Sequence, residues 1–363
     1  MEMKQKSGDN SQLIQAQTVI VNNGITEERA RQIFQEESAK ITAYTQEAHA
    51  VANERIHRLE DSFMNASSKI DGALESFADP AFQLLLRDAA ERAAATEREE
   101  DYDLLSQLLI CHIQKGEERK NRAGIHRAIQ IVDEIDNDAL CALTVFHAVE
   151  RVLPNAENCR EGLRILDELF SKLAYMELPK GSAWMDHLDV LGAVRINSLG
   201  TLKPLKEYYA ETLNGLVCIG IKKDSEDYKT VQSLLWHYQY LDRYFVDNEL
   251  LDGYVRLKIM NEASIDRLRI KVPPSKHCPA IDIPAPNEVK ELIKRVFGMY
   301  VKDSALLAQV KQAFNKAFDE YEHLNKICTW WDSIPNSIEI TSVGRVLAHT
   351  NAKRCEPSIP DLL

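Results

Sequence analysis

The chain lacks the sequence signatures that usually identify an enzyme. Its 363 residues contain no G-x-x-x-x-G-K-[ST] phosphate-binding loop, no G-x-G-x-x-G, no H-E-x-x-H and no G-x-S-x-G. The 7 cysteines are scattered without a C-x-x-C pair, a distribution typical of reduced thiols in a cytosolic protein. No motif in the sequence therefore indicates a reaction.

Long apolar runs are also missing. No stretch approaches the roughly 18 consecutive apolar residues of a membrane span, and Met1 to Lys6 lack the apolar region of a secretory signal. We therefore expect a cytoplasmic protein without a membrane partner. Positive charge is in deficit, since the formal net charge is -12, and this disfavours nucleic acid as a partner. With 45% hydrophobic and 28% charged residues, the composition is that of a globular chain with room for two or three domains.

Residues 1–25 predict a leader strand. From Leu13 to Val21 the side chains alternate with a period of two, and several are β-branched. A lone strand leaves its backbone groups unpaired, and no second strand follows within hairpin reach. We expect Ile14, Val19 and Val21 to pair with the leaders of other copies of the chain. The alternative is a disordered polar tail.

Residues 26–78 predict one long helix with a coiled-coil seam. Apolar or small residues recur at spacings of three and four, the pattern of a left-handed supercoil, with one stutter at Ala48, Ala52 and Ile56. We expect this seam to assemble the protein as a homo-oligomer, with a stoichiometry that the alanines leave open. Packing of the helix on its own globular body is the alternative. The predicted oligomerisation residues are Ile41, Ile56, Phe63 and Ile70.

The remaining chain predicts a mainly α-helical fold in three parts. Asp79-Pro80 ends the long helix, and amphipathic segments over residues 79–179 predict a helix bundle. Residues 180–272 predict a helical domain with short strands, in which a helix, an Asx-Gly turn and an extended segment occur twice. Residues 273–363 hold a proline-rich connector and C-terminal helices. Helices are expected over 287–299 and 304–330, and a short strand over 338–340 precedes a Thr- or Ser-capped final helix.

Asp186, His187 and Asp189 are the catalytic candidates. An imidazole between two carboxylates can act as a general base or hold a metal ion. The same residues also suit an ordinary helix start with acidic side chains in its first turn. The acidic run from Glu97 to Asp103 could bind Mg²⁺ or open a helix, and His277-Cys278 has no partner at ligand spacing. We predict no metal site and no cofactor.

Aromatic and basic clusters are the candidate binding surfaces. Aromatic side chains gather along 236–245 and at 330–331, where they predict a protein-interaction surface, with burial in the core as the alternative. The predicted partner-binding residues are Trp236, Tyr240, Tyr244, Trp330 and Trp331. Basic residues of the last helix could bind an anion, or they could complement the helix dipole. These anion-binding candidates are Arg345, Lys353 and Arg354.

At its two ends the chain resembles a family of uncharacterised bacterial proteins. The resemblance rests on Gly8-Asp9-Asn10-Ser11 with the following Ile14-Gln15-Ala16 and Val19-x-Val21, and on Thr341-Ser342-Val343-Gly344 and Asn351-Ala352-Lys353-Arg354. It implies a helical protein of bacterial phage defence and assigns no active residue. We expect a non-enzymatic homo-oligomeric scaffold or sensor with a protein partner. The alternative is a metal-dependent hydrolase or nuclease whose carboxylates and histidines the fold brings together.

Overall fold

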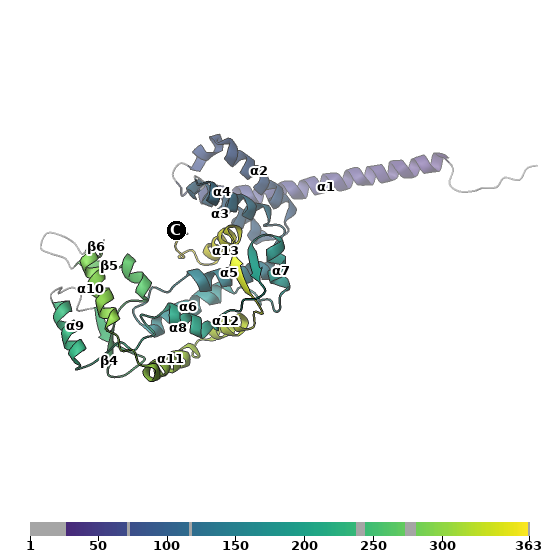
Figure 1. The fold of residues 1–363 in the computed structure, drawn as a ribbon. Coiled ribbons are helices and arrows are strands. Elements are labelled where there is room, and N and C mark those ends of the chain that lie inside the picture. The colour runs from purple at the N-terminus through teal and green to yellow at the C-terminus, as the bar shows by residue number, and fades with distance from the viewer. Residues whose placement is uncertain (1–26, 71–72, 116–117, 237–243, 273–280, 362–363) are drawn as a thin grey trace, which may run out of the picture. The chain divides into compact units, whose positions relative to one another are not determined.

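The computed structural model describes residues 27–70, 73–115, 118–236, 244–272 and 281–361 (Figure 1). These residues are mainly helical with a few short antiparallel strands, which confirms the predicted fold class. The chain divides into two compact units, residues 1–54 and 55–363. The division lies inside the first helix, whereas the divisions predicted at 179 and 272 lie inside the second unit.

Helix α1 (Glu27–Ser67) has 41 residues and is about 60 Å long. The prediction of one helix up to residue 78 is wrong, because α1 ends at Ser67 and a 3-10 helix, η1 (Ala73–Ala78), follows. The hydroxyls of Ser67 and Ser68 donate to backbone carbonyls three residues back, at 3.2 and 2.9 Å. Serine hydroxyls that bond to the local backbone compete with the helical ladder, which explains the early end.

The second unit contains the predicted helix bundle. Its helices are α2 (Pro80–Ala95), α3 (Glu99–Lys115), α4 (Arg119–Gln130), α5 (Asn137–Arg151) and α6 (Cys159–Leu173). Contrary to the prediction, Asp79-Pro80 does not end the long helix but begins α2: the Asp79 carboxylate caps α2 by accepting from the Ala81 N–H at 3.0 Å. Helix α5 is buried from Ala139 to Val149, so it lies in the centre of the core.

The C-terminal elements complete this main core. They are α7 (Ala183–Val190), β1 (Val194–Asn197), α8 (Leu205–Thr212), α11 (Ser304–Phe318), α12 (Glu322–Asp332), β7 (Ser337–Ile340) and α13 (Ser342–Cys355). Strands β1 and β7 pair antiparallel, with Val194 opposite Ile340, and α13 packs against α3, α4 and α5. The single helix predicted over 304–330 is wrong. A turn at 319–321 separates α11 from α12, and the Asn325 amide donates to two carbonyls of that turn at 2.9 and 2.7 Å.

A smaller hydrophobic core lies between residues 218 and 300. It contains β2 (Ile221–Lys222), α9 (Glu226–Trp236), β3 (Phe245–Asp247), β4 (Tyr254–Leu257), η3 (Glu262–Arg267), β5 (Arg269–Val272), β6 (Ile281–Pro284) and α10 (Asn287–Gly298). The sheet order is β2-β4-β3, so the strands of the two predicted helix–turn–strand segments pair with each other, Ile221 opposite Val255. Helix α10 confirms the helix predicted over 287–299. Within the described part of the chain, no helix is long and apolar enough to span a membrane.

Candidate functional site

Helix α13 is held at its first turn. Thr341 is the N-cap: its hydroxyl oxygen accepts from the Gly344 N–H at 3.2 Å, and the hydroxyl donates to the Gly192 carbonyl at 2.7 Å. A Cβ at Gly344 would overlap the carbonyl oxygen of Ala193, so only glycine allows this close approach. The Thr341–Gly344 segment therefore fixes the start of α13 against the residues before β1.

Helices α5 and α13 share a buried polar seam, which consists of Thr144, His147, His349 and Asn351. The Asn351 Nδ2 donates to the Thr144 Oγ1 at 2.8 Å. His147 Nε2 and His349 Nδ1 lie 3.3 Å apart, so one imidazole donates to the other. Buried polar groups that bond to each other in this way fix the register of two packed helices.

Both imidazoles of the α5–α13 seam are neutral at pH 7. Desolvation lowers the pKa of His147 to about 3, and the neighbouring imidazole and cationic side chains add to the shift. Desolvation also lowers the pKa of His349 to about 4. Burial likewise lowers the pKa values of His112 and His126, whose rings lie 5.7 Å apart on α3 and α4. The core of the second unit therefore disfavours protonated imidazole at several positions.

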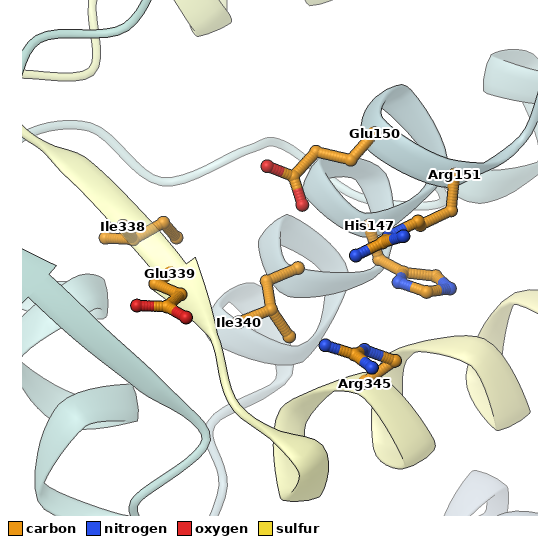
Figure 2. Close-up of a pocket in the computed structure, with 7 residues that line it drawn as sticks. All are labelled: His147, Glu150, Arg151, Ile338, Glu339, Ile340 and Arg345. Atoms are coloured by element: carbon orange, nitrogen blue, oxygen red, sulfur yellow. The ribbon is translucent and has the colours of Figure 1, made fainter. Parts of the chain in front are cut away.

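A hollow of about 180 Å³ opens beside this seam. Residues of three elements line it: His147, Glu150 and Arg151 of α5, Ile338, Glu339 and Ile340 of β7, and Arg345 of α13 (Figure 2). His147 and the two isoleucines are buried, whereas the four charged side chains are exposed. In Figure 2 the head groups of Glu150, Arg151 and Arg345 turn toward the same space, in front of His147. We call this site the α5–β7–α13 hollow.

The two arginines of the hollow differ from Arg98 and Arg256, two arginines of the unit that pair with a carboxylate in or beside the core. The Arg98 guanidinium lies 2.9 Å from a carboxylate oxygen of Asp101, and the Arg256 guanidinium lies 2.8 Å from one of Glu249. In the described ranges, neither Arg151 nor Arg345 has a carboxylate within ion-pair distance. Burial raises the pKa of the nearby Glu150, while the charges of Arg151 and Arg345 lower it. The hollow thus presents two guanidinium forks with donors available to a ligand.

The catalytic candidates lie on α7, and the structure does not bring them together. His187 Nε2 accepts from the Asp136 N–H at 3.2 Å, at the N-terminus of α5. Asp189 lies 3.6 Å from Arg195, and Asp186 is exposed. None of the hydrogen bonds found in the described ranges joins His187 to Asp186 or Asp189. His187 therefore supports the start of α5.

The three anion-binding candidates of α13 lie in three different environments. Arg345 lines the α5–β7–α13 hollow. Lys353 forms an ion pair with Asp361. Arg354 Nε donates to Asn351 Oδ1 at 3.0 Å, and its guanidinium lies 5.7 Å from the ring centroid of Tyr175. The structure therefore groups Arg345 with Arg151 of α5.

The aromatic candidates divide between core and surface. Trp330 and Trp331 are only 6% and 2% exposed, and the Trp331 ring stacks on Phe146 at 4.7 Å, so these two tryptophans follow the core alternative. Tyr244 is half-buried and its hydroxyl donates to the Arg269 carbonyl at 3.1 Å. Trp236 is 78% exposed. Tyr240 lies outside the described residues.

The oligomerisation candidates follow no single pattern. Ile14, Val19 and Val21 lie outside the described residues, and Ile41 lies within α1. Phe63 is 3% exposed, with its ring 6.0 and 6.1 Å from Phe77 and Phe82. Ile56 and Ile70 are half-buried, and Ile70 follows the end of α1. At Phe63 the structure shows packing on the chain's own body, the alternative to oligomerisation.

The acidic run from Glu97 to Asp103 is used in packing. Asp101 is 1% exposed and accepts from Arg98 Nε at 2.9 Å, while Asp103 accepts from the Ser62 hydroxyl at 2.7 Å. Glu99 forms an ion pair with Arg58. In the part of the chain that the structure describes, no group of three or more His, Cys, Asp or Glu side chains could hold a metal ion. His277 and Cys278 lie outside that part.

The sequence reasoning missed the α5 contribution to the hollow. His147, Glu150 and Arg151 are spaced i, i+3 and i+4, so they share one face in the second half of a helix whose buried residues are mostly apolar. That spacing was the available signal. Their neighbours on β7 and α13 come from almost 200 residues further along the chain, and no local pattern indicates that pairing.

Comparison with known proteins identifies a family but assigns no activity. One family model matches residues 24–360, and its description reads only ":-like". The match covers most of this mainly α-helical chain, and the chain belongs to that family. The comparisons with curated proteins and with solved structures found no match.

Proposed function

We propose that the chain is a non-enzymatic scaffold or sensor that assembles into a homo-oligomer through helix α1. The observation that carries this proposal is the exposure of α1 before its last turns. Residues 45–51 are all exposed, and Val51 is 46% exposed. A helix that packs against nothing is marginal in water, because most helix stability in proteins comes from burial of one face.

The exposed part of α1 continues a stripe that is buried elsewhere. Leu59 and Phe63 are each 3% exposed within the second unit. The same three- and four-residue spacing leads back through Ile56 and Ala52, which are half-buried, to the exposed Ala48. A stripe with this spacing suits a helix of the same kind. We therefore propose the α1 helix of a second copy as the occupant.

Two further observations support the wider role. The resemblance of the two ends of the chain to uncharacterised bacterial proteins supports a context in phage defence. The exposed indole of Trp236 supports contact with a protein partner, since large exposed aromatics are frequent in interface hot spots.

The test compares two alanines of α1. Ala48 and Ala50 are both exposed and lie about 200° apart around the helix. Light scattering should show a defined oligomer for the intact chain and a lower mass for Ala48→Glu, because the new charge lies on the stripe. Ala50→Glu, on the opposite face, should keep the wild-type mass, and removal of residues 1–25 tests the leader separately. A monomeric intact chain, or equal masses for the two variants, would overturn the proposal.

A further inference from the structure

We propose that the α5–β7–α13 hollow binds a small phosphate-bearing molecule, with Arg151 and Arg345 holding the phosphoryl group. This inference goes beyond assembly, because it rests on residues of the second unit alone.

The two guanidiniums supply the positive charge of the site, and Glu150 and Glu339 of the same lining oppose it. Arg151 ends α5 and Arg345 lies in the first turns of α13, and their head groups turn toward the same space (Figure 2). No carboxylate in the described ranges lies within ion-pair distance of either one. Two like charges that face one hollow favour an anion between them. Arginine binds carboxylate and phosphate in paired, charge-assisted hydrogen bonds.

The arrangement of the two arginines favours phosphate over carboxylate. Each guanidinium is a planar fork that engages two oxygens, and the two forks come from different elements. A carboxylate offers two oxygens in one plane, so it satisfies one fork well. A phosphoryl group offers three oxygens in a tetrahedral arrangement, so it can serve both forks at once.

The surrounding structure fixes the two helices that carry the arginines. Beneath them lie the buried His147, bonded to His349, and the buried side chains of Ile338 and Ile340 on β7. Because the seam fixes α5 relative to α13, a ligand has to order the two arginine side chains but not the helices that carry them. The volume of about 180 Å³ exceeds that of several waters, which suits a small molecule. The net charge of -12 disfavours nucleic acid as the source of the phosphate.

Glu150 gives the proposal a second, opposite test. Its carboxylate faces the same space as the two guanidiniums (Figure 2). A negative charge beside a bound phosphate weakens binding. Replacement of Glu150 by a neutral side chain of the same shape should therefore strengthen the binding of phosphate, which a general loss of structure cannot do.

The experiment is calorimetric titration of the full chain with inorganic phosphate and, separately, with methyl phosphate. Saturable binding is expected, with a loss of about tenfold or more in affinity for Arg151→Gln and for Arg345→Gln, since each removes a charge-assisted pair. Arg345→Lys should fall between them and the wild type. Arg127→Gln, at an exposed arginine of α4 away from the hollow, should match the wild type. Glu150→Gln should bind several-fold more tightly.

The outcomes distinguish a phosphate ester from free phosphate as the natural ligand, and they show which results would contradict the proposal. Tighter binding of methyl phosphate than of inorganic phosphate would indicate an ester as the natural ligand, and the reverse order would indicate free phosphate. Absence of saturable binding by the folded wild type would overturn the proposal, and so would equal losses in Arg345→Gln and Arg127→Gln. Repeating the titration on Ala48→Glu distinguishes failure of binding from failure of assembly, because Ala48 lies outside the second unit.

Discussion

Helices α13 and α1 both contain many polar residues, yet polar side chains are buried in α13 and exposed in α1. In α13, His349 and Asn351 are buried. In α1, every residue from 45 to 51 is exposed. The difference is the supply of hydrogen-bond partners: α5 provides Thr144 and His147 to the buried groups of α13. Burying a polar group costs free energy unless a partner compensates for lost water, so partners rather than polarity decide which helix lies inside.

The largest effect should come from replacing the same residue type in both helices. Asn351→Leu removes the donor to Thr144 and the acceptor for Arg354, and should lower the free energy of unfolding by about 3 kcal/mol. Asn53→Leu, at an exposed site of α1, should change it by less than about 0.5 kcal/mol. Urea unfolding of both variants measures the contrast. Similar losses at the two sites would contradict the role given to the α5–α13 seam.

A somewhat smaller effect should follow from adding one methyl group where α13 begins. Gly344→Ala pushes a Cβ into the Ala193 carbonyl oxygen and should cost about 2 kcal/mol through displaced backbone. Gly298→Ala at the end of α10 is the matched control, since a Cβ there meets nothing within 4 Å. The melting temperature is the measurement: it should fall for Gly344→Ala and stay near the wild-type value for Gly298→Ala. A stable Gly344→Ala chain would mean that α13 is not seated tightly on Ala193.

The histidines of the α5–α13 seam should make the fold sensitive to mild acid. Their folded pKa values, about 3 for His147 and about 4 for His349, lie below the value of about 6.5 in the unfolded chain. As the pH falls below about 6.5, the unfolded chain takes up protons first, so stability present above that pH is progressively lost down to the folded pKa values. Each histidine should cost about 1 kcal/mol between pH 7 and pH 5.5.

Urea unfolding across this pH range, compared with the His147→Gln and His349→Gln variants, tests that expectation. Each replacement should reduce the pH slope relative to the wild type. The slope that remains belongs in part to His112 and His126, whose pKa values burial also lowers. A slope unchanged in both variants would show that the seam histidines titrate normally.

The smallest expected effect concerns the N-cap of α13. Thr341→Ala removes the acceptor for the Gly344 N–H and should cost about 1 kcal/mol. Ser342→Ala, one residue on and exposed, should be nearly neutral. Thermal unfolding compares them. Equal stability of the two variants would mean that the Thr341 cap contributes nothing and that packing at Gly344 alone stabilises the start of α13.

Local signals in the sequence predicted the end of the chain well. The alternation over 338–340 corresponds to β7, and the predicted Thr or Ser cap with the helix after it corresponds to Thr341 and α13. The same kind of reasoning extended α1 too far, because it followed apolar spacing past Ser67 and Ser68, whose hydroxyls bond to the local backbone. It also joined α11 to α12, since no proline or glycine marks the turn at 319–321.

The candidate site depended on information that local patterns do not carry. Arg345 was identified from its place in a basic helix, but its partner Arg151 was not, because pairing of α5 with α13 is a tertiary feature. The charge of Lys353 looked equivalent to that of Arg345 until Asp361 was found beside it. Similarly, a tryptophan pair on a helix looks the same in sequence whether it faces a partner or, as Trp331 does, stacks on Phe146.

The bond between His147 and His349 joins residues that lie 202 positions apart in the chain. A contact of that separation cannot form until the whole intervening segment has been synthesised and the long loop between the two helices has closed. Until then the apolar face of α5 has no α13 to cover it. We therefore expect slow folding, a partly assembled bundle with exposed apolar surface on the way, and dependence on chaperones at high expression levels.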